Sequence, residues 1–362
     1  MDIIAQNYPA KYWHFLPNGR IQCDLCPQSC KLLEGQRGIC FGRKRVEDKL
    51  VLTTFGRSSG FCIDPVEKKP LNHFLPGSPI LSFGTSGCNL SCKFCQNWDV
   101  SKAREDNALS DCATPKAIAE KAVVLGAKSV AFTYNEPIIF MEYAVETAKE
   151  CHKRNIKTVA VTNGYICEEP RKEFFCNMDA ANVDLKGFSE KFYKNITGAT
   201  LKPVLDSLYY IKHHTNVWLE ITTLLITGLN DSDKELDEET DWIATNLGLD
   251  VPLHFTAFSP AWKMLNYPPT SVETLIHARD IALKKGLQYV YTGNVYHPEG
   301  SNTYCHNCKK VLITRDGYQI TEYNLTKNGL CKYCQTLCAG VFESAPGSWN
   351  GARKPLLMNN TE

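Results

Sequence analysis

The sequence predicts an α/β protein, a partial (β/α)6 barrel with one small cysteine-rich metal-binding module before it and another after it. Two observations support this fold class. Over residues 76–300, short apolar runs alternate with amphipathic stretches of helical spacing, the pattern of a parallel sheet with crossover helices. The flanking stretches are rich in cysteine and turn-forming residues, and the chain holds 17 cysteines among 362 residues. An open doubly wound sheet is the alternative.

The predicted domains follow this change of texture. We expect a cysteine-rich arm with a docking segment at 1–75, the barrel at 76–300, a zinc-ribbon-like module at 301–343 and a flexible tail at 344–362. Each barrel strand is a short apolar run followed by a helical segment. The predicted strands are residues 80–85, 129–134, 158–162, 181–185, 217–226 and 253–258, with a further one at 288–292.

Helix signals follow these strands. Thr114 precedes a proline and an apolar run of helical spacing, so we expect it to cap a helix. The pairs Ser232 with Glu235 and Thr270 with Glu273 have the spacing of capping boxes. In either predicted architecture the functional face lies at the carboxyl ends of the strands.

The composition narrows the classes of function. Forty Lys and Arg against 39 Asp and Glu give a net charge of +1, so there is no general attraction to nucleic acid or to anionic membranes. No apolar run approaches the roughly 18 residues of a membrane span, and residues 1–10 do not resemble a signal peptide. We therefore expect a cytoplasmic protein whose thiols stay reduced, so that clustered cysteines indicate metal sites rather than disulfides.

The central cysteine motif is C-x3-C-x2-C, formed by Cys88, Cys92 and Cys95, with Phe94 before the last cysteine. It directly follows the first predicted barrel strand. Three thiolates can hold three irons of a [4Fe–4S] cluster and leave the fourth iron open to chelate a small molecule. A structural zinc or thiol site is the alternative, although such a site needs a fourth ligand.

Two further sets of four cysteines flank the barrel. Both have the short spacings that let several thiolates converge on one centre. The first set suits zinc or an auxiliary iron–sulfur cluster, and the second suits a zinc ribbon or, less favoured, a rubredoxin-like iron site. The sets are Cys23, Cys26, Cys30 and Cys40, and then Cys305, Cys308, Cys331 and Cys334.

The central motif in this position resembles that of the radical SAM superfamily. Further segments extend the likeness to the radical SAM enzyme of the AmmeMemoRadiSam system, a branch related to pyruvate formate-lyase activating enzymes. The resemblance implies that a reduced [4Fe–4S] cluster cleaves S-adenosylmethionine to a 5′-deoxyadenosyl radical, which abstracts hydrogen from a protein or small-molecule substrate. The segments that carry it include residues 63–71, 73–78, 95–98, 134–137 and 291–295 and the terminal cysteine pairs.

The same resemblance implies residues that contact the cofactor at successive strand ends. Tyr134, Asn135 and Glu136 stand where relatives carry a Gly-Gly-Glu-Pro-like segment, with both glycines replaced here. Relatives also usually have Arg and His where this chain has Ala257 and Ser259. A packed structural role is the alternative for His254 and for the charged pair of residues 184 and 186. The full set of expected cofactor contacts is Phe94, Tyr134, Asn135, Glu136, Asn163, Asp184, Lys186 and His254.

The resemblance also implies partners. A reductant such as flavodoxin or ferredoxin would supply the electron, and relatives are associated with Memo-like and AMMECR1-like proteins. We expect no membrane partner. Nucleic acid is disfavoured because the second cysteine module carries only a modest set of lysines. The competing hypotheses are an iron–sulfur electron-transfer protein and a zinc-ribbon interaction protein, neither of which would cleave S-adenosylmethionine.

Overall fold

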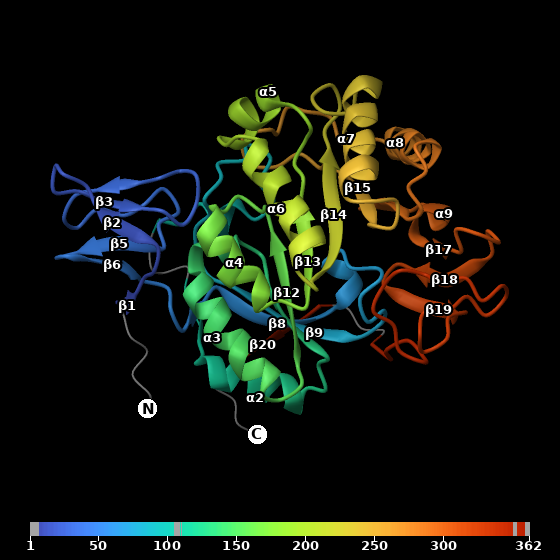
Figure 1. The fold of residues 1–362 in the computed structure, drawn as a ribbon, viewed down its shortest axis with the longest axis horizontal. Helices are drawn as coiled ribbons and strands as arrows, with labels where there is room; N and C mark the ends of the chain where they lie inside the picture. Colours follow the sequence, from blue (N-terminus) through green and yellow to red (C-terminus); the bar gives the residue numbers. More distant parts are fainter. Residues whose placement is uncertain (1–6, 105–108, 110, 350–352, 359–362) are drawn as a thin grey trace.

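The computed structural model describes residues 7–104, 109, 111–349 and 353–358. Its centre is a nine-stranded sheet around which the longer helices are arranged (Figure 1). Seven of its strands are parallel, and each lies within two residues of the bounds predicted from the sequence. These strands are β9 (Pro79–Gly84), β11 (Ser129–Phe132), β12 (Lys157–Thr162), β13 (Ala180–Asp184), β14 (Trp218–Leu225), β15 (Leu253–Ala257) and β16 (Val290–Gly293).

The order of the parallel strands distinguishes the two predicted architectures. Neighbours run from β9 to β16 in chain order without a reversal. A doubly wound sheet reverses its order at a switch point, whereas a barrel winds in one direction. The α/β prediction is confirmed, with the partial barrel as its architecture, and all seven carboxyl ends meet at one rim.

The helices that cover the barrel are amphipathic crossovers. As predicted, Thr114 accepts a hydrogen bond from Ala117 N at 3.2 Å and Ser232 accepts one from Glu235 N at 3.3 Å. The longer helices are α2 (Pro115–Val124), α3 (Met141–His152), α4 (Glu168–Cys176), α6 (Lys202–His214), α7 (Asp233–Asn246) and α8 (Val272–Lys284). The short ones are η1 (Val66–Lys68), α1 (Trp98–Ser101), η3 (Pro137–Phe140), α5 (Glu190–Phe192), the π-helix η4 (Tyr193–Thr197) and α9 (Pro298–Ser301).

One predicted cap is wrong by a residue. Ser271, not Thr270, caps α8, and its Oγ accepts from Thr274 N at 3.2 Å. The Thr270 side chain is buried, where its hydroxyl donates to Leu225 O and accepts from Phe258 N. Thr270 therefore connects the ends of two barrel strands, a long-range role that local spacing does not reveal.

The barrel sheet continues past both boundaries predicted for it. β8 (Gly60–Pro65) pairs antiparallel with β9, and β20 (Lys354–Leu356) pairs antiparallel with β8. The strand at 60–65 falls in the segment expected to be an arm, and the strand at 354–356 falls in the expected flexible tail. Both pair along one sheet edge, a contact that composition alone does not predict.

The N-terminal region before β8 is a layer of short strands packed on α3. A buried ion pair joins the two, with Arg43 Nη2 at 2.6 Å from Glu142 Oε2 and side chains that are 1% and 2% exposed. The strands are β1 (Tyr8–Pro9), β2 (Trp13–Phe15), β3 (Ile21–Cys23), β4 (Lys31–Leu32), β5 (Arg43–Val46), β6 (Lys49–Leu52) and β7 (Arg57–Ser58), which pairs with β10 (Asp111–Cys112).

The C-terminal module is a three-stranded sheet with its own small core. It consists of β17 (Thr303–Tyr304), β18 (Val311–Asp316) and β19 (Gln319–Tyr323), beside β16 (Figure 1). Residues 72 and 73 lie between this module and the barrel, and Glu220 on β14 holds them in place. The Glu220 carboxylate accepts from Asn72 N, His73 N, Trp218 Nε1 and a histidine of β15.

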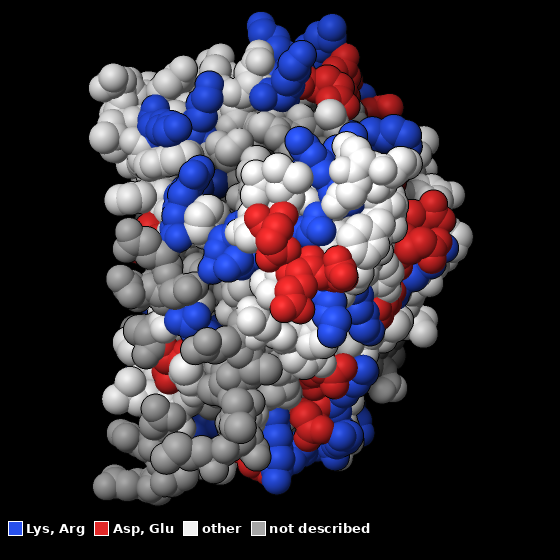
Figure 2. Space-filling view, turned by 90° about the vertical axis from the view of Figure 1, so that its left-hand side faces the viewer, with Lys and Arg blue, Asp and Glu red and all other residues white. Residues whose placement is uncertain are grey.

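The surface agrees with the near-zero net charge. On the face shown in Figure 2, Lys and Arg are interspersed with Asp and Glu rather than separated by sign. Among the described residues, no helix combines the length and the apolar character that crossing a bilayer requires.

Candidate functional site

The central cysteines lie on a loop at the carboxyl end of β9, as expected. Cys88, Cys92 and Cys95 line a cavity of about 330 Å³ at the barrel rim, within the range of about 300–1,000 Å³ typical of small-molecule pockets. We call it the cysteine pocket. Residues at or after the ends of all seven parallel strands contribute to its wall.

Close backbone contacts hold this loop. Ser91 N donates to Thr197 O at 2.7 Å and Lys93 N donates to Ile196 O at 3.0 Å, so the loop is paired with the π-helix η4. Gly87 has a φ of +92°, and a Cβ atom there would collide with the carbonyl oxygen of Cys40. The loop therefore packs directly against the first flanking cysteine set.

The donor set suits an iron–sulfur cluster rather than one ion. Burial raises the pKa of Cys92 to about 11 and raises that of Cys88 further, so both thiols keep their protons until a cationic centre displaces them. Three thiolates match three irons of a [4Fe–4S] cluster with one open iron, whereas a structural single-ion site needs a fourth ligand.

Asn135 ties the strand next to β9 onto the cysteine loop. Its Oδ1 accepts from Thr85 N at 2.9 Å, and its Nδ2 donates to Thr85 Oγ1 at 3.1 Å and to Gly87 O at 3.0 Å. Tyr134 beside it has a φ of +68°, a left-handed conformation that costs a non-glycine residue about 1–2 kcal/mol. The glycines expected here are replaced by side chains with contacts of their own.

Glu136 and Asn163 connect the next two strand ends. The Glu136 carboxylate accepts from Thr162 Oγ1 and, at 2.8 Å, from Asn163 N, and burial raises its pKa to about 7. Asn163 Nδ2 donates to Asn89 Oδ1 at 2.8 Å and lies 3.9 Å from Cys88 Sγ. Both residues line the cysteine pocket, beside the first cysteine.

A charged pair at the end of β13 forms another part of the wall. Lys186 Nζ donates to Asp184 Oδ2 at 2.6 Å, and it lies 6.0 Å from the Phe94 ring centroid. Burial by itself lowers the pKa of Lys186, but Asp184 and Cys92 raise it above its ordinary value. The structure thus keeps a protonated lysine beside the cysteines.

His254 is not brought to the cysteine pocket. It lies on β15, 3% exposed, with Nε2 2.7 Å from Glu220 Oε2 and its ring stacked on Tyr291. Among the described residues that line the pocket, Thr256 is the β15 residue. Because side chains alternate along a strand, both point to the same face, but His254 lies two residues further from the rim.

Comparisons with known proteins agree with this geometry. The sequence profile described as the radical SAM superfamily matches residues 83–242, which include the end of β9, the cysteine loop and the parallel strands β11 to β14. An uncharacterized protein of Methanocaldococcus jannaschii is 37% identical over 326 residues, which cover 90% of this chain and 97% of the relative. The chain belongs to the radical SAM superfamily.

Two named relatives of this radical SAM enzyme are more distant. The 4-hydroxyphenylacetate decarboxylase activating enzyme of Clostridioides difficile is 22% identical over 237 residues, 63% of this chain and 73% of the relative. The GTP 3′,8-cyclase of Limosilactobacillus fermentum is 27% identical over 259 residues, 65% and 75% of the two chains. The superfamily implies a [4Fe–4S] cluster and S-adenosylmethionine, for which the thiols and the pocket volume are suited.

Outside the radical SAM pocket, the two flanking cysteine sets differ. In the first set, a Cβ atom at Gly38 would lie 3.6 Å from the Sγ atoms of both Cys30 and Cys40, so these sulfurs face one space. Burial, together with the nearby Cys23, raises the pKa of Cys40 to about 11. Cys26 is buried in the same group and interacts with the three others.

The second set forms a compact single-ion geometry. The four sulfurs of Cys305, Cys308, Cys331 and Cys334 lie within 4.8 Å of one another. Burial raises the pKa of Cys305, whereas hydrogen bonding with Thr336 lowers that of Cys334 to about 5. One cysteine pair precedes β18 and the other follows β19, so the two pairs meet at the open end of this hairpin, which is the arrangement expected of a ribbon.

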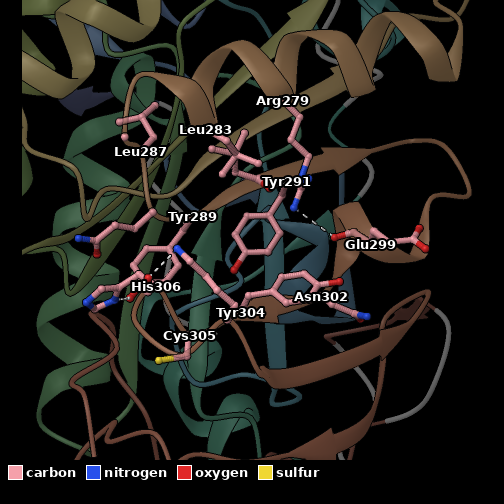
Figure 3. A pocket seen from close by; sticks show the side chains of 14 residues that line it. Arg279, Leu283, Leu287, Tyr289, Tyr291, Glu299, Asn302, Tyr304, Cys305 and His306 are labelled. Atoms are coloured by element: carbon pink, nitrogen blue, oxygen red, sulfur yellow. Dashed lines mark hydrogen bonds between the residues drawn. The ribbon is translucent and has the colours of Figure 1, made fainter. Parts of the chain in front are cut away.

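A larger cavity of about 600 Å³ lies away from the radical SAM pocket, between α8, β16 and the C-terminal module. Figure 3 shows Tyr289 and His306 side by side near Cys305, with Arg279 directed toward Glu299. Tyr289 Oη lies 3.2 Å from His306 Nδ1, and Arg279 donates to backbone carbonyls of Val290 and Glu299.

Several pocket residues were not predicted. Asn97 donates through Nδ2 to Tyr134 O at 2.9 Å, and Thr222, Thr256 and Asn294 complete the wall at the later strands. Asn97 lies in the segment that supports the family resemblance, two residues after Cys95, and this proximity was the available signal. The two threonines have none, because threonine is an ordinary strand residue.

Proposed function

We propose that this protein reductively cleaves S-adenosylmethionine and uses the resulting radical to abstract hydrogen from a substrate. The observation that carries the proposal is the placement of three cysteines and a polar wall in one pocket at the rim of a radical SAM barrel. When bound, the cluster supplies one electron from an external reductant, which breaks a sulfonium C–S bond to give methionine and a 5′-deoxyadenosyl radical.

In this proposal, the chain's own residues bind the cluster and orient the cofactor. Cys88, Cys92 and Cys95 hold three irons and leave one free for the amino and carboxylate groups of the cofactor. Lys186 is the charge suited to that carboxylate, although it must share its proton donors with Asp184. Phe94 and the neighbouring buried wall exclude water from the pocket.

We further propose that the substrate is a protein, with a small molecule as the alternative. The relative that supports this is an activating enzyme. In such a reaction the adenosyl radical takes a hydrogen atom, 5′-deoxyadenosine leaves and the radical remains on the substrate. Memo-like and AMMECR1-like proteins are the first candidates to test, and flavodoxin or ferredoxin is the proposed reductant.

For the flanking sites we propose zinc at Cys305, Cys308, Cys331 and Cys334, because four closely spaced thiolates match tetrahedral coordination. The other set, Cys23, Cys26, Cys30 and Cys40, is proposed to hold zinc or an auxiliary iron–sulfur cluster. Metal analysis of anaerobically purified protein distinguishes zinc from an auxiliary cluster at this set, since only an auxiliary cluster adds iron and sulfide beyond those of the central cluster.

The decisive experiment is a turnover assay on reconstituted protein. With dithionite and S-adenosylmethionine, we expect methionine and 5′-deoxyadenosine to form in equal amounts, as measured by chromatography. Cys92→Ala should abolish both products, while Cys176→Ala, at an exposed cysteine on α4, should leave them unchanged. Iron–sulfur absorption without any cofactor cleavage would instead indicate an electron-transfer protein, and zinc without iron would indicate an interaction protein.

A further inference from the structure

Two non-glycine residues in the wall of the cysteine pocket have a left-handed backbone, Tyr134 with a φ of +68° and Asn294 with a φ of +61°. Asparagine tolerates this region because its short side chain bonds locally, whereas tyrosine does not. Something outside the local backbone must therefore hold Tyr134 in place.

The Tyr134 side chain is held from β8, on the side away from the cysteines. Its hydroxyl donates to Asp64 Oδ2 at 2.7 Å, and Asp64 is fully buried. Lys69 Nζ donates to the same oxygen at 2.6 Å and lies 5.0 Å from the tyrosine ring centroid. The guanidinium of Arg353, just before β20, lies 5.2 Å from the same ring.

The Tyr134 backbone faces the cysteine loop. Its carbonyl accepts from Asn97 Nδ2 at 2.9 Å, after the last cysteine of the motif. The next residue, Asn135, donates to Gly87 O at 3.0 Å, before the first cysteine. Residues 134–135 are thus hydrogen-bonded to the loop on both sides of its three cysteines, while the Tyr134 phenol is hydrogen-bonded to Asp64 on β8.

We propose that Asp64 is a positioning residue for S-adenosylmethionine binding, because it anchors the Tyr134 phenol and so holds residues 134–135 in the conformation that shapes the cofactor's wall. Asp64 lies outside the pocket and acts through Tyr134. The inference rests on the proposed function, since it concerns the affinity of the same site. It assigns a role to the segment before β9 beyond packing.

The test measures cofactor affinity separately from turnover. Equilibrium dialysis with radiolabelled S-adenosylmethionine on reconstituted, fully iron-loaded protein gives Kd for wild type, Tyr134→Phe, Asp64→Asn and the double variant. We expect Kd to rise about tenfold in Tyr134→Phe, which removes the contact, and less in Asp64→Asn, whose amide oxygen can still accept from the phenol. The double variant should bind no more weakly than Tyr134→Phe, because both changes act on one shared contact. KM for the cofactor should rise in parallel, with kcat for 5′-deoxyadenosine within twofold of wild type.

The matched control is Tyr143→Phe, which also removes one buried hydroxyl bond, to Ala113 O at 2.6 Å, but does not line the pocket. It should leave Kd unchanged. Tyr134→Phe with full iron and a Kd within twofold of wild type overturns the inference, as does an additive double variant. Should Asp64→Asn fail to fold, Tyr134→Phe alone decides. A wild-type protein that binds no S-adenosylmethionine overturns the proposed function instead.

Discussion

Glu239 on α7 is a carboxyl group with few partners in a dry position. It is fully buried, its Oε1 accepts from Thr223 Oγ1, and its Oε2 has no hydrogen-bond partner among the described residues. Burial raises its pKa to about 8 from an ordinary 4.5. The folded protein therefore holds a proton on Glu239 at a pH where the unfolded chain has released it.

This gives a pH-dependent stability with a defined sign. From pH 4.5 to 8 the unfolded state binds fewer protons at this position, so the contribution of Glu239 to stability falls as the pH rises. Glu239→Gln removes the titration. We expect the variant to match wild type near pH 5 and to gain up to about 4 kcal/mol by pH 8. Urea unfolding at both pH values measures this, and a constant difference would contradict it.

At the scale of single residues, the sequence indicated the positions of residues that lie in a motif or after a strand, but not of residues that are placed by long-range contacts. The cysteines, Asn163 and Lys186 follow strand ends, and parallel strands bring such residues to one rim whatever the details. His254 and Asp64 depend on which side chain reaches across the barrel. That is set by packing between segments far apart in the sequence, which a single sequence does not record.

At the scale of elements, the cysteine loop and the N-terminal layer are packed so closely that one methyl group added at Gly87 would collide with the backbone of Cys40. Gly87 has a positive φ, and the Cys40 carbonyl occupies the space of a side chain there. Gly87→Ala should therefore displace the loop, and we expect at least half of the bound iron to be lost after reconstitution.

Gly126→Ala is the control for backbone conformation. It also has a positive φ, of +64°, but no atom lies within 4 Å of the Cβ position. This variant should lose about 1 kcal/mol of stability and keep its iron. Colorimetric iron analysis and thermal unfolding compare the two variants. Equal iron content in both would show that the contact with Cys40 does not matter.

The contact between β5 and α3 yields a second prediction at this scale. Arg43→Met leaves the buried Glu142 carboxylate without its cation, which we expect to cost about 3–5 kcal/mol. Changing both residues to methionine should recover most of that loss, because the isolated charge is then gone. Urea unfolding measures all three variants, and a loss below about 1 kcal/mol in Arg43→Met would refute the prediction.

Elements were predictable where the signal is local and regular. All seven parallel strands follow from apolar runs, and two of three expected caps are correct. β8 and β20 were not identified as strands of this sheet, because neither residues 60–65 nor the three-residue edge strand at 354–356 has a distinctive sequence pattern. Their pairing depends on tertiary contacts between segments far apart in the sequence.

At the scale of the whole molecule, the C-terminal module is connected to the barrel through buried polar contacts. His73 Nε2 lies 2.6 Å from Tyr291 Oη, and Arg315 on β18 donates to Asn72 O at 2.8 Å. We expect Cys331→Ser to remove one equivalent of zinc and lower Tm by several degrees, because metal binding stabilises a small module that cannot form a large core.

The same variant should keep the iron of the radical SAM site. Metal analysis by mass spectrometry and calorimetry measure both quantities on one sample. Loss of iron together with zinc would mean that the module and the cysteine pocket fold as one unit. No zinc in the wild-type protein would contradict the assignment of this site.

The pairing of β20 with β8 has a consequence for biosynthesis. The first strand of the barrel sheet to be made is completed at its edge by the last strand to be made. Until residues 354–356 are available, β8 leaves a row of backbone groups open, and open edges promote association between chains. Deletion of residues 354–356 should therefore lower the yield of well-folded protein, because it leaves the edge of β8 open.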